Sequence, residues 1–322
     1  MMSDFRDIWN KVGGADVVGQ VLREHMVTST VLATLACGTS RKGLEIVREV
    51  MNLKLYRRIR QKMASDLPEL RERVEREYAD STVLHNDIVW TLWLQGEDEA
   101  PEIVRACLAS MRKHLTGKRI VVLDEGTMLD DVTLPEHVLQ KYKAGTITRT
   151  HFSDLLRLEL LTTRGGTWAD ATVWLSGTPA SYVTDSNLFM FQSMKPGLDG
   201  KSLCMSSWLV TAQAPSRILL LARNLLYRYW ERYDAMDDYF LVHYMLQIAI
   251  DEYPEEWRRV PPVSNSTPHV LLLRLGEPFD QHVFDAVCSQ TAVHKLTYKG
   301  LDGISRGGTY LGRILGDEVK GC

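Results

Sequence analysis

Between Asp87 and Leu175, short runs of apolar residues alternate with segments whose apolar residues recur at helical spacing. In chain order the pattern predicts a strand at 88–94, a helix from Pro101, a strand at 119–124, helices at 135–142 and 153–163, and a strand at 167–175. Strands separated by helices in this way pair in parallel, because the helix carries the chain back across the sheet. This predicts an α/β fold with a largely parallel sheet and ligands at the carboxyl ends of its strands.

The rest of the chain extends this sheet and adds helices. Two further strands are predicted at 188–194 and 203–211, the second antiparallel, and a long helical region at 215–251. We therefore expect two parts, a helical extension at 1–82 and the α/β domain at 83–322.

Helical spacing also dominates the N-terminal extension. Apolar residues recur from Leu44 to Met63, and five of the nine residues at 54–62 are basic. Asp66 is expected to cap a following helix that has Pro68 in its first turn. Two interpretations of the basic segment stay open, a solvated helical face or a peripheral membrane or partner contact through residues 44–63.

Charge and composition exclude some classes of function. The chain has 38 Lys and Arg against 41 Asp and Glu, a net charge of −3. A protein whose main partner is nucleic acid needs a basic excess to neutralise phosphates, so we expect no nucleic-acid partner. The chain has five widely spaced cysteines, no leader-like start and no run of about 20 apolar residues. These features predict a cytoplasmic protein. The alternative is a protein bound peripherally at the inner face of the membrane.

The densest chemical signal lies at residues 153–172. Ser153 is expected to cap a helix on which Asp154 and Arg157 share one face. The pair Gly165-Gly166 ends this helix and turns the chain into a strand that contains Asp170. Arginine can neutralise a phosphate, and aspartate can accept hydrogen bonds from sugar hydroxyls.

Each of these residues also has a purely structural interpretation. Asp154 and Arg157 could form an ordinary helical ion pair. Asp170 is harder to explain in this way, because a buried carboxylate must be paired, bound to a metal or neutralised by a raised pKa. Trp93 and His294 could be core residues, and His243 fits helix packing better than substrate contact.

The run from Asp154 through GGTWADAT at 165–172 resembles the signature of the capsular polysaccharide synthesis protein family. It is similar also to mannosyltransferase-like enzymes and to clostridial toxin glucosyltransferase domains. Further blocks carry the resemblance across residues 85–299, namely the Trp-x-x-Gly pattern at 93–96 and the runs at 237–243 and 294–298.

The resemblance implies a GT-A fold and a Mn²⁺ (or Mg²⁺) ion that bridges the diphosphate of a nucleotide-sugar. Asp170 matches the first acid of a DxD-type motif, and Thr172 stands where the second acid, the direct metal ligand, is expected. His294 matches a further metal ligand. The pair Asp154 and Arg157 matches the residues that hold the donor sugar and phosphate.

The remaining donor contacts follow from the same resemblance. Trp93 matches the aromatic residue that stacks on the base, and Gln95 and Gly96 belong to the same block. Asp124 ends the second strand near this ligand. Lys295, beside His294, is expected to face the diphosphate. The implied activity is retaining transfer of a hexose, with UDP favoured, to a saccharide acceptor in capsule or cell-surface polysaccharide synthesis. The alternative, favoured by Thr172, is a non-catalytic sugar-nucleotide-binding or assembly module.

Overall fold

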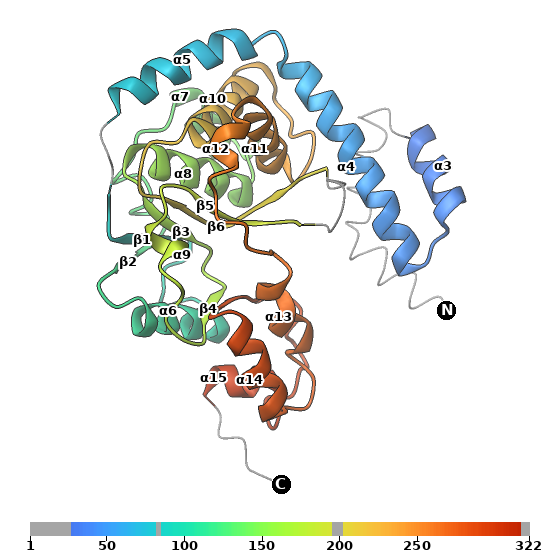
Figure 1. Cartoon of the computed structure of the whole chain (residues 1–322), viewed down its shortest axis with the longest axis vertical. Helices are drawn as coiled ribbons and strands as arrows, with labels where there is room; N and C mark the ends of the chain where they lie inside the picture. Colours follow the sequence, from blue (N-terminus) through green and yellow to red (C-terminus); the bar gives the residue numbers. More distant parts are fainter. Residues whose placement is uncertain (1–26, 82–84, 195–201, 317–322) are drawn as a thin grey trace.

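The computed structural model describes residues 27–81, 85–194 and 202–316 (Figure 1). The helices before the sheet are α3 (Val27–Cys37), α4 (Arg41–Met63) and α5 (Leu67–Asp80). The next elements are β1 (Ile88–Leu92), α6 (Glu102–His114), β2 (Arg119–Leu123), α7 (Glu136–Lys143), α8 (Arg149–Thr163), β3 (Gly166–Ala169), β4 (Val173–Leu175), α9 (Tyr182–Asp185), β5 (Phe189–Gln192) and β6 (Met205–Ala212). The remainder comprises α10 (Arg217–Arg232), α11 (Leu241–Glu252), α12 (Pro254–Trp257), the 3-10 helix η1 (Thr267–His269), α13 (Val270–Arg274), α14 (Gln281–Gln290), β7 (Val293–Lys295) and α15 (Tyr310–Leu315).

A five-stranded sheet in the order β2-β1-β3-β6-β5 forms the centre of the molecule. Strand β1 pairs in parallel with both β2 and β3, and β6 is antiparallel to its neighbours β3 and β5. Four of the five strands therefore run in the same direction. The predicted α/β fold with a mostly parallel sheet is confirmed, as is the antiparallel direction of the strand at 203–211.

Two hydrophobic cores cover the two faces of this sheet, because neighbouring side chains of a strand point to opposite faces. On β1 and β3, Trp90 and Trp168 belong to one core, whereas Val89 and Ala169 belong to the other. Helices α8, α10 and α11 supply the first core, and α6, α14 and α15 supply the second. Figure 1 shows α8, α10 and α11 on one side of the sheet and α6 with the C-terminal helices on the other.

The strand predicted at 167–175 is divided in two, which corrects the position of Asp170. Strand β3 ends at Ala169, and a turn at 170–172 is closed by a hydrogen bond from Val173 N to Asp170 O (2.9 Å). Strand β4 then leaves the central sheet and pairs antiparallel with β7. Asp170 thus lies just beyond the carboxyl end of β3. Outside the strand, its side chain is not bound to point to one face of the sheet.

Helix α8 begins one turn earlier than predicted. Its cap is Thr148, whose side chain accepts a hydrogen bond from His151 N, and Ser153 lies inside the helix. At its other end, Gly165 and Gly166 both have positive φ (71° and 91°). A Cβ on Gly166 would lie 2.5 Å from Ile88 O, so the close pairing of β3 with β1 requires glycine here.

Helices α4 and α5 share the first core. Leu55, Ile59 and Met63 of α4 and Leu70 and Val74 of α5 are buried in the same cluster as the sheet residues. This core therefore contains residues from both sides of the expected boundary between 1–82 and 83–322, and the division into two domains stays a prediction. Residues 1–26 and 82–84 lie outside the described part of the chain.

Asp66 does not cap α5 through its side chain, contrary to the prediction. It is 2% exposed, and its Oδ1 accepts hydrogen bonds from Arg228 (3.1 Å) and Arg232 (2.5 Å) of α10. The helical region predicted at 215–251 is also divided, because α10 ends at Arg232 and α11 begins at Leu241. Within the described ranges, no helix is both long and apolar enough to cross a membrane.

Candidate functional site

The register of the parallel strands places three residues that were predicted to belong to the site at one edge of the sheet. Leu92 pairs with Leu123, and Trp90 pairs with Trp168, so β1, β2 and β3 end at similar levels. Trp93, Asp124 and Asp170 each follow one of these strands. Strands are about 4.8 Å apart and β1 lies between β2 and β3, so Asp124, just after β2, lies about 10 Å from the end of β3.

Asp170 is the centre of a charged cluster at this edge. Its Oδ1 accepts hydrogen bonds from Arg157 Nη2 (3.1 Å) and Trp168 Nε1 (3.0 Å). Its Oδ2 accepts one from Lys295 Nζ (2.9 Å). The side chain is 29% exposed, so Asp170 is partly accessible at this edge.

Two opposing effects set the protonation of Asp170. Burial on its own raises the pKa of a carboxyl group, because it penalises the charged form. Here the charges of Lys295 and Arg157, with hydrogen bonds from Lys295 and Trp168, outweigh burial and hold the pKa of Asp170 below its ordinary value. Asp170 is therefore an anion over the whole physiological pH range.

Arg157 is fixed by contacts on several sides. Its Nη1 donates to the carbonyl oxygen of Ser207 (2.6 Å) and lies 3.3 Å from Asp154 Oδ1. The guanidinium stacks over the Trp168 ring at 4.9 Å from its centroid. The expected pairing of Asp154 with Arg157 on one face of α8 is present, and this pair is continuous with Asp170.

Lys295 and Thr172 enter the cluster through the pairing of β7 with β4. Val173 is paired with Lys295, and Leu296 N donates to Thr172 O (2.9 Å). This register brings Lys295 Nζ to 2.5 Å from Thr172 Oγ1 and to Asp170. Residues more than 120 positions apart in the sequence therefore meet in one site.

His294 does not join this cluster, contrary to the role as metal ligand expected for it. It neighbours Lys295 on a strand and so points to the opposite side. Its Nε2 lies 3.0 Å from Ser176 Oγ, its ring packs on Trp174, and the residue is 0% exposed. Burial lowers the pKa of His294 to about 4, so the imidazole is neutral at pH 7.

Asp124 is also held apart from Asp170. Its Oδ1 accepts hydrogen bonds from Gly126 N, Thr127 N and Thr127 Oγ1, each at 2.9 Å. These bonds from Thr127 and Gly126 lower the pKa of Asp124. The carboxylate closes the turn after β2, and it borders the sheet edge without touching the charged cluster.

The Trp-x-x-Gly block forms a turn at the end of β1. Gly96 N donates to Trp93 O (2.9 Å), and Gly96 has φ of 83°, which explains the glycine. Gln95 between them is exposed. The ring of Trp93 is partly buried, and its centroid lies 5.1 Å from that of Tyr298 in an edge-on arrangement. Trp93 and Tyr298 thus bring an aromatic pair to the same edge of the sheet.

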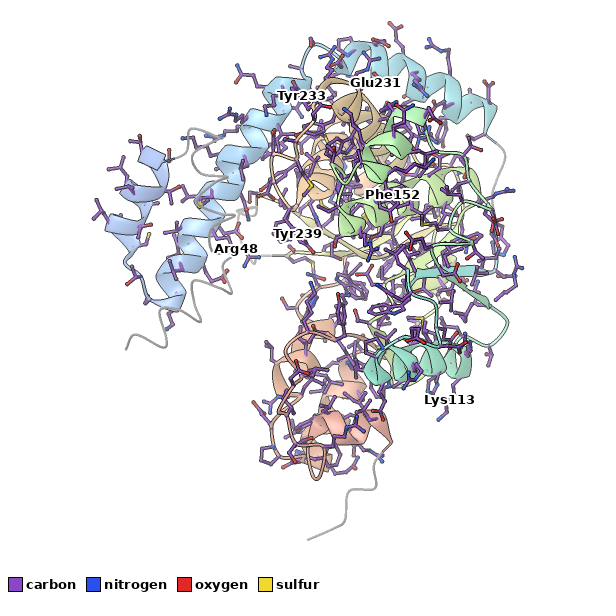
Figure 2. The ribbon with its side chains drawn as sticks, turned by 180° about the vertical axis from the view of Figure 1, so that it is seen from behind. Arg48, Lys113, Phe152, Glu231, Tyr233 and Tyr239 are labelled. Carbon is purple, nitrogen blue, oxygen red and sulfur yellow. The ribbon has the colours of Figure 1, made fainter. Side chains whose placement is uncertain are left out.

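Sequence reasoning did not assign to the site two side chains that border the cluster, His243 and Tyr239. His243 Nε2 lies 3.2 Å from Ser207 Oγ, and burial lowers the pKa of His243 to about 4. Tyr239, exposed in the loop before α11 and labelled in Figure 2, has its pKa raised by desolvation and by the charges of Asp154 and Asp170. The block at 237–243 was the only signal that pointed to this loop.

The expected metal ligands do not fit a divalent ion as they are arranged. Both oxygens of Asp170 accept hydrogen bonds, Thr172 Oγ1 is bound to Lys295, and His294 faces away. Across the described ranges, no group of three or more His, Cys, Asp or Glu side chains is placed to hold a metal ion. The cation that lies between Asp170 and Thr172 is the ammonium group of Lys295.

Fold and cluster together define an α/β protein with a mixed cationic and carboxylate site at the carboxyl edge of its parallel strands. Residues 40–314 match the family described as capsular polysaccharide synthesis protein, and the chain belongs to this family. The matched region begins within the N-terminal helices, so α4 and α5 are part of it.

Comparison with solved structures gives a distant likeness to the protein titled PaToxG Glycosyltransferase. The identity is 11%, the alignment covers 61% of this chain and 80% of that chain, and the TM-score is 0.38. Comparison with curated protein sequences gives no significant match.

Proposed function

We propose that this protein is a glycosyltransferase that moves a hexose from a nucleotide-sugar, with UDP as the favoured nucleotide, to a saccharide acceptor during capsule or cell-surface polysaccharide synthesis. The family membership supports this role. The observation that carries it is the cluster in which Arg157 and Lys295 both contact the Asp170 carboxylate at the end of β3.

Glycosyl transfer needs groups of both signs in one place. The leaving diphosphate gains negative charge as the C1–O bond breaks, and fixed cations stabilise that charge. Arg157 and Lys295 are such cations, and each is held by several partners. The carboxylate oxygens of Asp154 and Asp170 can accept hydrogen bonds from the hydroxyls of the donor sugar. Trp93 and Tyr298 offer aromatic surface for the base, at the neighbouring strand end.

We propose retention of the anomeric configuration, as the resemblance of the run at 154–172 to retaining enzymes implies. No carboxylate of the cluster is free of cationic partners, since Asp154 and Asp170 are both bound to Arg157. A nucleophile held in this way is a poor candidate for a covalent glycosyl intermediate. Attack by the acceptor hydroxyl on the same face as the leaving diphosphate needs no such nucleophile.

A thermal-shift panel tests the proposal directly. The protein would be melted with UDP, GDP, CDP and their common hexose conjugates, each with manganese and with EDTA. A ligand at a hundredfold excess over Kd stabilises the native state by about 2.7 kcal/mol, which raises Tm by a few degrees. We expect UDP compounds to give the largest shift. If no nucleotide changes Tm, the proposed function is wrong.

A non-catalytic sugar-nucleotide-binding module is the second candidate. The feature that favours it is Thr172 in place of an acid. The discriminating measurement is hydrolysis or transfer of the UDP-hexose that gives the largest thermal shift. Binding without any turnover, in the presence of saccharide acceptors, would favour the module over the enzyme.

We propose further that α3 and α4 contact an anionic lipid surface. Helix α3 has no charged residue, and α4 has eight basic residues against two acidic ones. Three exposed side chains of α4, Ile46, Val50 and Leu53, recur at the spacing of one helical face. Figure 1 shows α3 lying against α4 at the side of the molecule, away from the sheet. Apolar side chains beside a basic helix suit an interfacial helix.

Vesicle sedimentation tests this contact. We expect binding to vesicles of phosphatidylglycerol and phosphatidylcholine, weaker binding to phosphatidylcholine alone, and loss of binding at high salt. The triple variant Ile46→Ser, Val50→Ser, Leu53→Ser should bind less, whereas Leu273→Ser, which alters an apolar residue of α13 that is 78% exposed, should bind normally. Equal binding of the triple variant and the wild type would contradict the proposal.

A further inference from the structure

Lys295 occupies the position between the two oxygen-bearing side chains where the DxD-type pattern leads one to expect a metal ion. Its Nζ lies 2.9 Å from Asp170 Oδ2 and 2.5 Å from Thr172 Oγ1. The side chain is 18% exposed, and β7 fixes its backbone by pairing with β4. The ammonium is therefore held from both ends, by the strand and by its two oxygen partners.

The geometry points to Lys295 as the cation that binds the donor diphosphate, so we propose that this protein binds and uses its nucleotide-sugar without a divalent metal ion. This inference rests on the proposed function and names the group that performs charge neutralisation in it. It concerns the same site, and the residues that carry it are Asp170, Thr172 and Lys295.

The chemistry of the donor set supports this assignment. Manganese and magnesium prefer several oxygen ligands, carboxylates above all. Among the described ion pairs, Lys295 has one carboxylate partner, Asp170, which already accepts three hydrogen bonds from Arg157, Trp168 and Lys295. An ion bound to Oδ2 would lie against the Lys295 ammonium, and the two cations would repel each other.

The replacement of an acid by Thr172 follows from the same arrangement. A second carboxylate at this position would serve a metal ion, whereas a hydroxyl is sufficient to orient an ammonium. A lysine ammonium has three N–H donors. Asp170 and Thr172 accept two of them, which leaves the third for an oxygen of the diphosphate.

Arg157 is the second fixed cation in this scheme. Its Nη1 and Nη2 groups face Ser207 O, Asp154 and Asp170, and its guanidinium lies over Trp168. In the transfer step the C1–O bond to the diphosphate breaks and its electron pair goes to the leaving oxygen, beside Lys295. The acceptor oxygen bonds to C1, and its proton goes to a phosphate oxygen of the leaving group. The products are a glycoside and a nucleoside diphosphate.

Calorimetric titration of UDP into wild-type protein, with EDTA or with manganese, is the primary test. We expect the same Kd within about twofold in the two buffers, and no heat from a titration of manganese alone. If UDP binds with manganese and not with EDTA, the Lys295 proposal is overturned and the proposed function stands. If UDP and GDP bind in neither buffer, the proposed function fails and the Lys295 proposal fails with it.

Variants test the role of Lys295 itself. Loss of a hydrogen bond to a charged group corresponds to roughly a 10- to 100-fold change in affinity, so we expect Lys295→Met to weaken UDP binding by that factor in EDTA. Lys295→Arg, which keeps the charge, should restore most of it. The double variant Lys295→Ala, Thr172→Asp rebuilds a pair of carboxylates and should bind UDP only with manganese.

Two outcomes with these variants contradict the proposal. One is unchanged UDP affinity in a Lys295→Met protein with a normal melting curve. The other is a double variant that binds UDP equally well in EDTA and in manganese, because two acids without the lysine should need a metal ion to bind the diphosphate. If Lys295→Met does not fold, the wild-type titration in EDTA decides the question alone.

Discussion

Helix α8 contributes to two clusters of buried charge that differ in their surroundings. Towards the sheet edge, Asp154 and Arg157 join Asp170 and Lys295, and the Asp170 side chain is 29% exposed. On the α10 side of α8, Glu159 pairs with Arg223 of α10, and their side chains are 10% and 9% exposed. The two clusters have similar chemistry and are separated by less than two turns of one helix.

The partners of each cluster explain what it does. Glu159 accepts hydrogen bonds from Tyr227 (2.7 Å) and Arg223 (3.4 Å), and Arg223 also donates to Glu77 of α5 (2.6 Å). All of these residues lie on helices, and their contacts join α5, α8 and α10. The Asp170 cluster instead joins a single helix, α8, to the turn after β3 and to the end of β7. Charge held between helices stabilises the fold, whereas charge at the end of parallel strands is available to a ligand.

The largest effect on stability should come from Arg223→Ala. It leaves Glu159 buried without its cation, which in comparable pairs lowers the free energy of unfolding by about 3–5 kcal/mol. Arg274→Ala is the control, because it breaks an exposed pair with Glu277 and should change the free energy by at most about 1 kcal/mol. Chemical denaturation would measure both. Equal losses in the two variants would remove the distinction between the clusters.

Asp170→Asn should lower activity strongly and stability only slightly, the reverse of Arg223→Ala. It removes the charge that holds Arg157 and Lys295 in place, and loss of one such electrostatic contact lowers turnover by roughly 10²–10³. We expect a smaller loss of stability than for Arg223→Ala, since solvent reaches this side chain. Asp131→Asn, in an exposed loop, is the control. Near-normal UDP-hexose turnover in Asp170→Asn would show that the active site lies elsewhere.

Low pH should destabilise the fold through two buried histidines, His243 beside the Asp170 cluster and His294 beside Ser176. Burial lowers the pKa values of His243 and His294 to about 4, below the ordinary 6.5. Above pH 6.5 both histidines are neutral in the folded and in the unfolded chain, and the free energy of unfolding has its full value. As the pH falls from 6.5 towards 4, the unfolded chain takes up protons first, and the free energy of unfolding decreases.

The expected slope is up to about 1.4 kcal/mol per pH unit for each of these histidines. Denaturation of the wild type and of His294→Asn between pH 7 and pH 4 would measure it, and the variant should show a shallower dependence. The manganese titration should be the same for both proteins, since His294 faces Ser176. An unchanged pH profile in the variant would mean that His294 is not the neutral, buried group described above.

Trp93→Ala should have the smallest of these effects. Stacking of a base on an aromatic side chain contributes about 1–3 kcal/mol in comparable contacts, so UDP should bind more weakly by that amount. Trp174→Ala, which alters a tryptophan packed on His294, is the matched control and should leave UDP affinity unchanged. Equal UDP affinity for Trp93→Ala and the wild type would assign Trp93 to the core.

Local patterns were sufficient to predict most elements of the sheet domain. The apolar runs at 88–94 and 119–124 and the Gly165-Gly166 pair correspond to β1, β2 and the junction of α8 with β3. Predictions failed where long-range contacts decide the structure. The turn at 170–172 exists because β4 pairs with β7, more than 100 residues later, and no local signal specifies that pairing. The N-cap of α8 was misplaced because Thr148 and Ser153 are both suitable capping residues.

The candidate site shows the same division. The pairing of Asp154 with Arg157 could be predicted from their spacing on a helix, and the need of Asp170 for a partner from the cost of an unpaired buried carboxylate. The place of Asp170 after β3, and not within a strand, could not be predicted. The contacts of Lys295 with Asp170 and Thr172, and of His243 with Ser207, depend on which faces of distant elements meet. The resemblance predicts His294 as a metal ligand and Lys295 as a diphosphate contact, yet neighbouring residues of a strand point in opposite directions.

The pairing of β4 with β7 also bears on how the protein is made. Asp170 and Lys295 are 125 residues apart. At about 5–20 residues per second, the ribosome adds Lys295 roughly 6–25 seconds after Asp170. During that interval α8 and β3 can fold around Arg157, but the carboxylate lacks its second cation. The charged centre is therefore completed late in synthesis, and a nascent chain that stops before β7 contains the acid without the lysine that holds it.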